Sequence, residues 1–147
     1  MNELETREFG KYLKHIMNHM VRKIDHKVSQ DGLTTVQGRV IGYLAKKERT
    51  GEVVFQRDVE EEFHIRRSSV TSVIQGLEKN EYITRESVAQ DARLKKIILT
   101  DKGRKINESV RETIFSEERK ILQVLTDEEK EQFFYLIEKL EKGLSNL

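Results

Sequence analysis

Not one of the 147 residues of this chain is proline, and only 8 are glycine. Proline inside a helix removes a backbone hydrogen bond and clashes with the preceding turn, and interior glycine also destabilises a helix. A chain with so few helix breakers can form long, uninterrupted helices. Apolar residues recur at helical spacing along most of it, so the sequence predicts a mainly α-helical fold in a single domain of residues 1–147.

Long helices are predicted at both ends of the chain. Apolar residues at helical spacing predict a first helix over residues 5–28, which a glycine-containing turn at residues 30–32 should end. Thr100 is expected to start another long helix. Thr126, with Glu129 three residues later, is a capping box that should start the last helix.

The middle of the chain predicts shorter elements. Thr34 and Gln37 form another capping box, and the helix that they start should end in a charged loop at residues 46–51. Two short helices and two strands are predicted next, over residues 56–63, 67–79, 82–88 and 94–99, with a turn at residues 89–93. A short helix, a tight turn, a second helix and a hairpin follow one another in a winged helix-turn-helix, so the expected fold is six helices with a two-stranded wing.

The predicted helix at residues 67–79 has one apolar face and one short polar face. Val70, Val73, Ile74 and Leu77 follow the i, i+3, i+4, i+7 pattern of a buried face. A helix that enters the DNA major groove needs small or hydrogen-bonding side chains outside, and basic residues at its start can reach phosphates or guanine edges. The residues predicted to contact DNA here are Arg66, Arg67, Ser68, Ser69, Thr71, Ser72 and Gln75.

The predicted hairpin is basic. Arg93 is expected near its tip, where a guanidinium can enter a narrow, electronegative minor groove. Asp91, two residues earlier, can hold that guanidinium in one rotamer, and Lys95 and Lys96 are expected over flanking phosphates. We therefore predict that the wing contacts DNA together with the helix.

The net charge of +1 hides an uneven distribution of charge. Residues 1–65 carry 11 basic and 11 acidic side chains, and residues 112–147 carry 5 basic and 9 acidic ones. Residues 66–111, in contrast, carry 11 basic and 6 acidic side chains, a net charge of +5. A local basic excess attracts polyanions even when the whole molecule is near neutral.

Other interpretations stay open at this point. The polar helix face also fits an ordinary solvated surface, and Asp91 with Arg93 also fits an exposed ion pair worth about 0–1 kcal/mol. An enzyme is the main alternative class, but the sequence has no glycine-rich phosphate loop, nucleophile elbow or metal-hydrolase motif. A helical protein-interaction module without DNA binding is a third interpretation.

Composition narrows the expected chemistry and location. The chain has no cysteine, which excludes disulfides, thiolate metal sites and thiol redox sensing. No apolar run approaches the ~18 residues of a membrane span, and the N-terminal sequence lacks a signal-peptide core. We expect no cofactor, no membrane contact and a cytoplasmic location.

Residues 55–104 resemble the winged helix-turn-helix of the MarR family of bacterial transcription regulators. The stretch "FQRDVEEEFHIRRSSVTSVIQGLEKNEYITRE" followed by "DARLKKIILTDKGR" carries the resemblance. Its specific part is an acid and an arginine, an apolar strand and then Leu-Thr-x-x-Gly, matched by Asp91, Arg93, Leu99, Thr100 and Gly103. Helix order and chain length also fit.

The resemblance implies a homodimer whose first and last helices intertwine. Residues 34–100 would form the DNA-binding part, and residues 1–30 and 101–147 the dimerisation part, whose large apolar side chains would need a partner. The resemblance also implies repression of transcription from a palindromic site in double-stranded DNA. Release by a small, often aromatic, ligand bound between the two parts is implied as well.

The sequence departs from the family pattern at three places. His64 replaces a glycine that is common in the turn before the recognition helix, and histidine tolerates a left-handed conformation better than most residues. Arg66 stands where a small helix cap is common, although Ser68 could cap a slightly later helix. Glu81 replaces a glycine after that helix, and Asn80 is the expected left-handed residue there.

The sequence says less about which ligand or metal the protein would bind than about its DNA contacts. Tyr12, His15 and His19 on the first helix are candidates for lining an organic-ligand pocket. His15 and His19 are four residues apart, a spacing that can share a metal, so a metal-responsive regulator is an alternative. Without a third ligand in view, we favour surface or packed histidines and predict no metal site.

Overall fold

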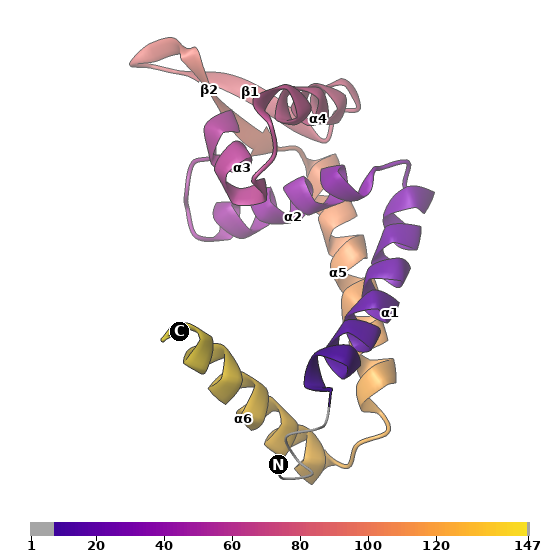
Figure 1. The fold of residues 1–147 in the computed structure, drawn as a ribbon. Coiled ribbons are helices and arrows are strands. Elements are labelled where there is room, and N and C mark those ends of the chain that lie inside the picture. The colour runs from indigo at the N-terminus through magenta and orange to yellow at the C-terminus, as the bar shows by residue number, and fades with distance from the viewer. Residues whose placement is uncertain (1–7, 147) are drawn as a thin grey trace.

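A computed structural model of the protein describes residues 8–146, and Figure 1 traces the chain. The elements are α1 (Phe9–Gln30), α2 (Thr35–Arg49), α3 (Gln56–Phe63), α4 (Arg67–Lys79), β1 (Ile83–Val88), β2 (Asp91–Leu99), α5 (Asp101–Leu122) and α6 (Asp127–Leu144). The predicted fold class, helices with a two-stranded antiparallel wing, is confirmed. The predicted helix start at Glu5 lies outside the described residues. No helix within residues 8–146 is long and apolar enough to cross a membrane.

The elements divide into a winged end and a helical end. The helices α2, α3 and α4 gather with the hairpin at the top of Figure 1, and α1 packs along α5 below them. From the end of α5 the chain turns back into α6, which stands apart from the other helices.

A single apolar core holds the winged end together. Its fully buried side chains come from α2, α3, α4 and β1, namely Val40, Ile41, Val59, Val70, Ile74, Leu77 and Ile83. Ile97 and Leu99 of β2 lie on one face of the wing and close this core, as their alternation predicts. The α4 face predicted to be buried is therefore the one that anchors the helix.

Threonine caps start three of the helices at the predicted places. The backbone N–H of Gln37 donates to the Thr34 hydroxyl at 3.2 Å, and that of Glu129 donates to Thr126 at 3.2 Å. In both cases the glutamine or glutamate side chain accepts a bond from the cap's own N–H, which completes a capping box. Such caps satisfy amide groups that a helix cannot pair internally.

The Leu-Thr-x-x-Gly sequence at residues 99–103 has a structural explanation. The Thr100 hydroxyl accepts a bond from Gly103 N–H at 3.1 Å and donates to the carbonyl of Glu81 at 2.6 Å. A Cβ at Gly103 would collide with the carbonyl oxygen of Tyr82. Glycine at this position lets the start of α5 approach the chain just before β1, so the motif joins the winged and helical ends.

The predicted loop at residues 46–51 is wrong, because α2 continues through Arg49. Basic residues are favourable in the last turn of a helix, and the chain meets no breaker before Gly51, which has φ of +71°. Glu48 in this last turn accepts bonds from Arg104 of α5, one at 2.6 Å. The hydrogen bond from Arg104 is the main cause of the lowered pKa of Glu48.

Two departures from the family pattern concern residues that were expected in a left-handed conformation. The prediction is right for the first and wrong for the second. His64 adopts φ of 50° and ψ of 39°, so histidine does make the left-handed turn between α3 and α4. After α4 the left-handed residue is Glu81, with φ of 62°, and the prediction of Asn80 is wrong. Asn80 keeps φ of −89° because its N–H still bonds to carbonyls of the last helical turn.

Candidate nucleic-acid interface

The outward face of α4 presents the short polar side chains that the sequence predicts. Ser69, Ser72 and Gln75 are exposed, while Val70, Ile74 and Leu77 on the opposite face are fully buried and Val73 is half-buried. Arg66 occupies the N-cap without a side-chain cap bond, and α4 begins at Arg67. The predicted start at Arg67 is confirmed, so the alternative of a later start capped by Ser68 does not apply. Both arginines and Ser68 are exposed at the start of the helix.

Thr71 occupies a different environment from the other polar residues of this face. Its side chain is half-buried, donates to the carbonyl of Arg67 at 2.9 Å and accepts a bond from Gln56 Nε2 at 2.8 Å. Gln56 is the first residue of α3, so this contact helps to fix the angle between the two helices. The hydroxyl of Thr71 is thus engaged inside the helix-turn-helix.

The wing differs from the predicted hairpin in its turn and register. The chain reverses at Ala89 and Gln90, and β2 starts at Asp91, so the predicted turn at residues 89–93 is too long. Ser87 pairs with Lys95 but Val88 pairs with Asp91, which leaves residues 92–94 in a bulge. Bulges re-aim side chains, and Arg93 lies exposed in the middle of this one.

Asp91 was predicted to contact the guanidinium of Arg93, but it bonds to the backbone of that residue. Its Oδ1 atom accepts a bond from the backbone N–H of Arg93 at 2.9 Å, and within the described residues no ion pair joins it to the guanidinium. An aspartate that bonds the backbone two residues ahead stabilises a local turn. Asp91 therefore shapes the main chain that carries Arg93 and leaves the arginine head group free to turn.

The two lysines of the wing are not equivalent. Lys95 is exposed near the bulge, whereas Lys96 is half-buried and its Nζ lies 3.6 Å from Oε2 of Glu86 on the neighbouring strand. A cation with a carboxylate neighbour contributes less to the local potential. Lys95 is thus the stronger candidate for a phosphate contact.

The three candidate ligand residues of α1 lie away from any enclosed cavity. Tyr12 is exposed, and His15 and His19 line a shallow groove with Ile16 and Ile121. His19 Nε2 lies 3.4 Å from Oε2 of Glu117 on α5. This pairing ties α1 to α5, which accounts for His19 without a ligand.

Glu117 is a carboxylate held against α1 by its neighbours. Its pKa is lowered chiefly by a hydrogen bond from Lys120, at 2.7 Å, with a smaller effect of His19. Among residues 8–146, no three histidine, aspartate or glutamate side chains gather as a metal site.

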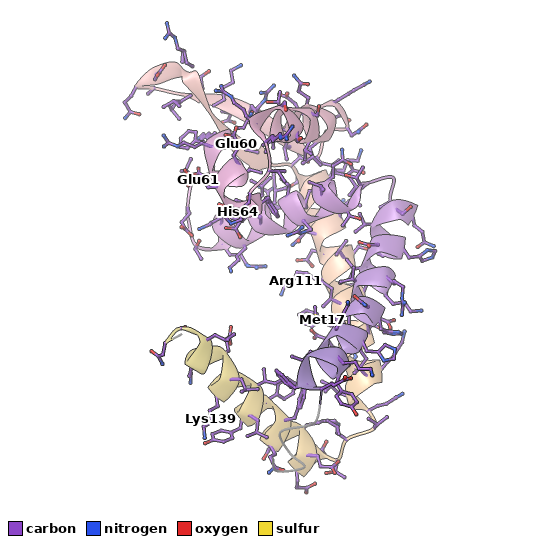
Figure 2. The ribbon with its side chains drawn as sticks, viewed as in Figure 1. Met17, Glu60, Glu61, His64, Arg111 and Lys139 are labelled. Atoms are coloured by element: carbon purple, nitrogen blue, oxygen red, sulfur yellow. The ribbon has the colours of Figure 1, made fainter. Side chains whose placement is uncertain are left out.

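A cavity lies between α1, α2 and α5, in the region where the family resemblance implies a ligand pocket, but none of the residues that line it was predicted. It has a volume of about 440 Å³, and its walls include Val21, Ile24, Val110 and Ile114. Its charged lining is uneven, with one carboxylate against four cations: Asp25, Arg39, Lys46, Arg49 and Arg111. Figure 2 labels Arg111 on α5. No short sequence window contains this set, since its members come from three helices.

Arg39 connects this cavity to the helix-turn-helix. Its guanidinium carbon lies 5.1 Å from the ring centroid of Phe63, the last residue of α3, and Phe63 packs edge-on against Tyr43 of α2. A cation over an aromatic face is attracted by the ring. One cavity residue therefore contacts the helix that precedes the left-handed turn into α4.

Comparisons with known proteins agree with this architecture. A sequence model of the MarR family matches residues 31–94. The chain is similar to MepR from Staphylococcus aureus in a crystal structure with DNA, with 30% sequence identity, coverage of 96% of this chain and 99% of that chain, and a TM-score of 0.69. Another MepR structure, described as a transcription regulator of the multidrug efflux pump MepA, is 27% identical over 94% of this chain and 99% of that chain, with a TM-score of 0.80.

A more distant structure shares the fold alone. The YusO protein from Bacillus subtilis is 22% identical and has a TM-score of 0.78, with coverage of 97% of this chain and 98% of that chain. No curated protein matches the chain.

Proposed function

The chain belongs to the MarR family of transcription regulators, which are not enzymes, and from this premise we propose that it is a sequence-specific DNA-binding repressor that a small ligand releases. In this proposal α4 enters the major groove and Arg93 of the wing enters the adjacent minor groove. Sequence is read at base edges, so Ser69, Ser72 and Gln75 would specify the operator. A regulator of this kind acts where the DNA is, in the cytoplasm.

One observation carries the proposal. The exposed polar face of α4 and the bulge with Arg93 belong to one module, fixed together by the buried faces of α4, β1 and β2. The DNA complex of MepR supports the same use of the fold, since that protein is 30% identical to this chain. A rigid module with two exposed reading elements suits adjacent grooves of a duplex.

We also propose that the protein works as a homodimer. Residues 34–100 would form the DNA-binding part, and residues 1–30 and 101–147 the dimerisation part. The proposal of a homodimer rests on α6. This helix carries many apolar side chains, but none of its residues is buried in the single chain. Twofold symmetry would place two α4 helices roughly 34 Å apart, which requires a palindromic operator.

Arg93→Ala tests the proposal directly. After binding-site selection from random duplexes, we expect this variant to bind the selected operator at least about 30-fold more weakly, because the proposed dimer loses two groove contacts and each costs about 1–3 kcal/mol. Its unfolding midpoint should not change, since Arg93 is exposed. Fluorescence anisotropy at fixed salt measures the affinity.

Arg22→Ala is the matched control for Arg93→Ala. It removes the same charge from an exposed position on α1 and should bind the operator as the wild type does. Equal affinities of the Arg93→Ala and Arg22→Ala variants would remove the wing from the mechanism. Selection that returns no preferred sequence would reject a sequence-specific regulator altogether.

The cavity between α1, α2 and α5 suggests the class of ligand. Its apolar walls suit a ring, and its four cations against one carboxylate suit an acid group. A carboxylate there would compete with the Phe63 ring for Arg39, which gives ligand binding a path to α3. We therefore propose that the releasing ligand is a small aromatic acid.

Simple probes test this ligand class. Phenylacetate is expected to weaken operator binding in a dose-dependent way, and its uncharged amide should not, because only the acid can pair with the cations. Arg111→Ala should require about tenfold more phenylacetate or higher, since a hydrogen bond to a charged group contributes about 1.5–3 kcal/mol. Lys105→Ala, exposed on α5 outside the cavity, is the control. Equal effects of the acid and the amide would contradict the proposed class.

A further inference from the structure

The outer half of the wing has few contacts that hold it against the rest of the protein. Ile83, Ile97 and Leu99, at the base of the hairpin, are buried in the core. None of residues 86–95, farther out along the two strands, is buried. A two-stranded hairpin is only marginally stable by itself. The direction in which its tip points therefore depends on contacts made near its middle.

One ion pair joins the middle of the wing to α4. Arg85 of β1 donates to Oε2 of Glu78, in the last turn of α4, through Nε at 3.1 Å and Nη2 at 2.7 Å. Only 28% of the Arg85 side chain and 38% of the Glu78 side chain are exposed, so water screens the pair only in part. The hydrogen bond from Arg85 is the main cause of the lowered pKa of Glu78, and the charge of Lys95 on β2 has a smaller effect. Cations of both wing strands thus lie near one ionised carboxylate of α4.

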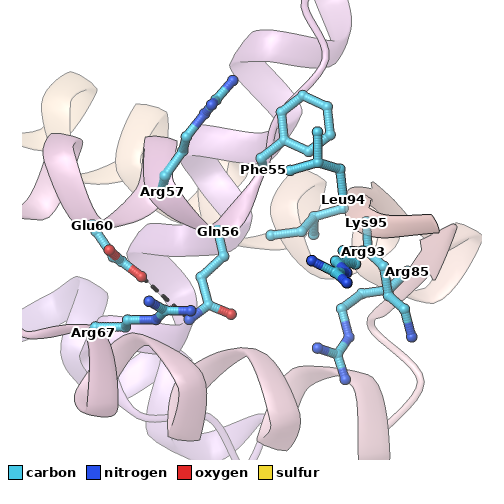
Figure 3. Close-up of a pocket in the computed structure, with 10 residues that line it drawn as sticks. Phe55, Gln56, Arg57, Glu60, Arg67, Arg85, Arg93, Leu94 and Lys95 are labelled. Atoms are coloured by element: carbon cyan, nitrogen blue, oxygen red, sulfur yellow. Dashed lines mark hydrogen bonds between the residues drawn. The ribbon is translucent and has the colours of Figure 1, made fainter. Parts of the chain in front are cut away.

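Arg85 differs from the other cations around it. A cleft of about 300 Å³ lies between α4 and the wing, and the cations of these two elements that line it are Arg67, Arg85, Arg93 and Lys95. Figure 3 shows Arg85 and Arg93 on the wing side of the opening, across from Arg67. Of these four cations, Arg85 alone forms an ion pair with a carboxylate of residues 8–146. The protein itself therefore holds Arg85 in place, whereas the other three head groups can turn toward DNA.

The strand register places this ion pair next to the bulge. Arg85 pairs with Ile97, and the next pair on the same face of the hairpin is Ser87 with Lys95. The bulge that carries Arg93 begins directly beyond that second pair. Among the residues that the structure describes, the two bonds from Arg85 to Glu78 are the only side-chain hydrogen bonds between α4 and the wing. The position of the bulge relative to α4 thus depends on this contact.

We propose that Glu78 is a positioning residue for the minor-groove contact: through Arg85 it holds the wing in one position relative to α4, so that Arg93 reaches the minor groove when α4 lies in the major groove. The inference rests on the proposed function, because it concerns the two elements proposed to contact DNA. Glu78 itself does not bind DNA, since phosphates repel a carboxylate. A wing that is already in place loses less conformational freedom when both elements bind, which is the advantage of preorganisation.

Glu78→Ala separates positioning from simple electrostatics, because the two predict opposite results. Removal of a negative charge from a DNA-binding surface should by itself strengthen binding to any duplex, since it leaves Arg85 free to pair with a phosphate. If Glu78 positions the wing, the variant should instead bind the selected operator about three- to thirtyfold more weakly, because the loss of a partly exposed ion pair is a small effect that each protomer of the dimer suffers. Binding to a duplex of mixed sequence should not weaken. Fluorescence anisotropy with both duplexes at one salt concentration measures the two affinities.

Glu61→Ala is the matched control, because it removes the same charge from an exposed position on α3, which Figure 2 labels. This variant should bind the operator at least as tightly as the wild type. A second comparison uses the Arg93→Ala protein as the background. Glu78→Ala should cause no further loss of operator affinity there, since the side chain that it positions is already absent.

Hydrogen exchange without DNA reports on the wing directly. The backbone amides of residues 86–95 should exchange faster in Glu78→Ala than in the wild type, whereas those of α3 should not change. Unchanged exchange in the wing, operator binding as tight as that of the wild type, or an equal loss in the Arg93→Ala background would overturn the positioning role while the DNA-binding function stands. If Arg93→Ala itself bound the operator like the wild type, the proposed wing contact would fall, and the role of Glu78 with it.

Discussion

A variant with Ile137→Asp and Leu140→Asp is expected to be a monomer and to lose operator binding by a factor of about 10²–10⁴. Both side chains are exposed in the isolated chain, 38% and 55%, although they lie on an amphipathic helix. Monomeric proteins rarely expose such continuous apolar surface, so we expect a partner subunit to cover it. Two linked DNA-binding parts bind two half-sites far more tightly than one part binds a single half-site.

The winged end should survive these substitutions. α6 contributes no residue to the buried core, which lies in α2, α3, α4 and the wing. Sedimentation velocity at micromolar concentration measures the oligomeric state, and circular dichroism checks that helix content is kept. Operator binding by the monomer should resemble the weak, salt-dependent binding of a single half-site.

Lys139→Asp is the matched control, because it places the same aspartate on the same helix. Position 139 lies about 200° around the helix from position 137, and Figure 2 labels Lys139 on α6. This variant should remain dimeric and bind the operator normally. A wild-type protein that sediments as a monomer, or a double variant that remains a dimer, would contradict the proposed assembly.

Local signals in the sequence predicted the elements well. Capping boxes placed the starts of α2 and α6, because the hydrogen bonds of a cap involve neighbours only three residues away. The apolar stripe of α4 identified its buried face for a similar reason. The end of α2 was predicted wrongly, because residues 46–49 are all charged and resemble a loop in the sequence. In the structure they stay helical, and Glu48 among them pairs with Arg104 of α5, which lies far away in the sequence.

Structural features that depend on residues far apart in the sequence could not be predicted from local patterns. The bulge that carries Arg93 arises from a register shift between two strands, which alternation within one strand does not record. The cavity between α1, α2 and α5 brings together Asp25, Arg39 and Arg111, which come from three helices far apart in the sequence. The basic excess of residues 66–111 predicts a surface that attracts polyanions, and which of its side chains contact DNA stays a prediction.

The second large effect is expected in the core beneath the recognition helix. Ile74→Ala should lower the free energy of unfolding by about 2–5 kcal/mol, because Ile74 is 0% exposed and its removal leaves a cavity among packed side chains. α4 depends on this packing, since its N-cap, Arg66, makes no side-chain cap bond. Urea denaturation at one fixed protein concentration measures the change, because the stability of a dimer depends on concentration.

Gln75→Ala, the next residue on the exposed face, is the control for this experiment and should change stability by no more than about 0.5 kcal/mol. The two variants should also differ in their DNA sequence preference, measured at a low temperature. Folded Ile74→Ala protein should keep its sequence preference, because Ile74 contacts no DNA, whereas Gln75→Ala should alter preference without loss of stability. If Ile74→Ala were as stable as Gln75→Ala, α4 would not be anchored by the buried face described above, and its position relative to the wing would need another cause.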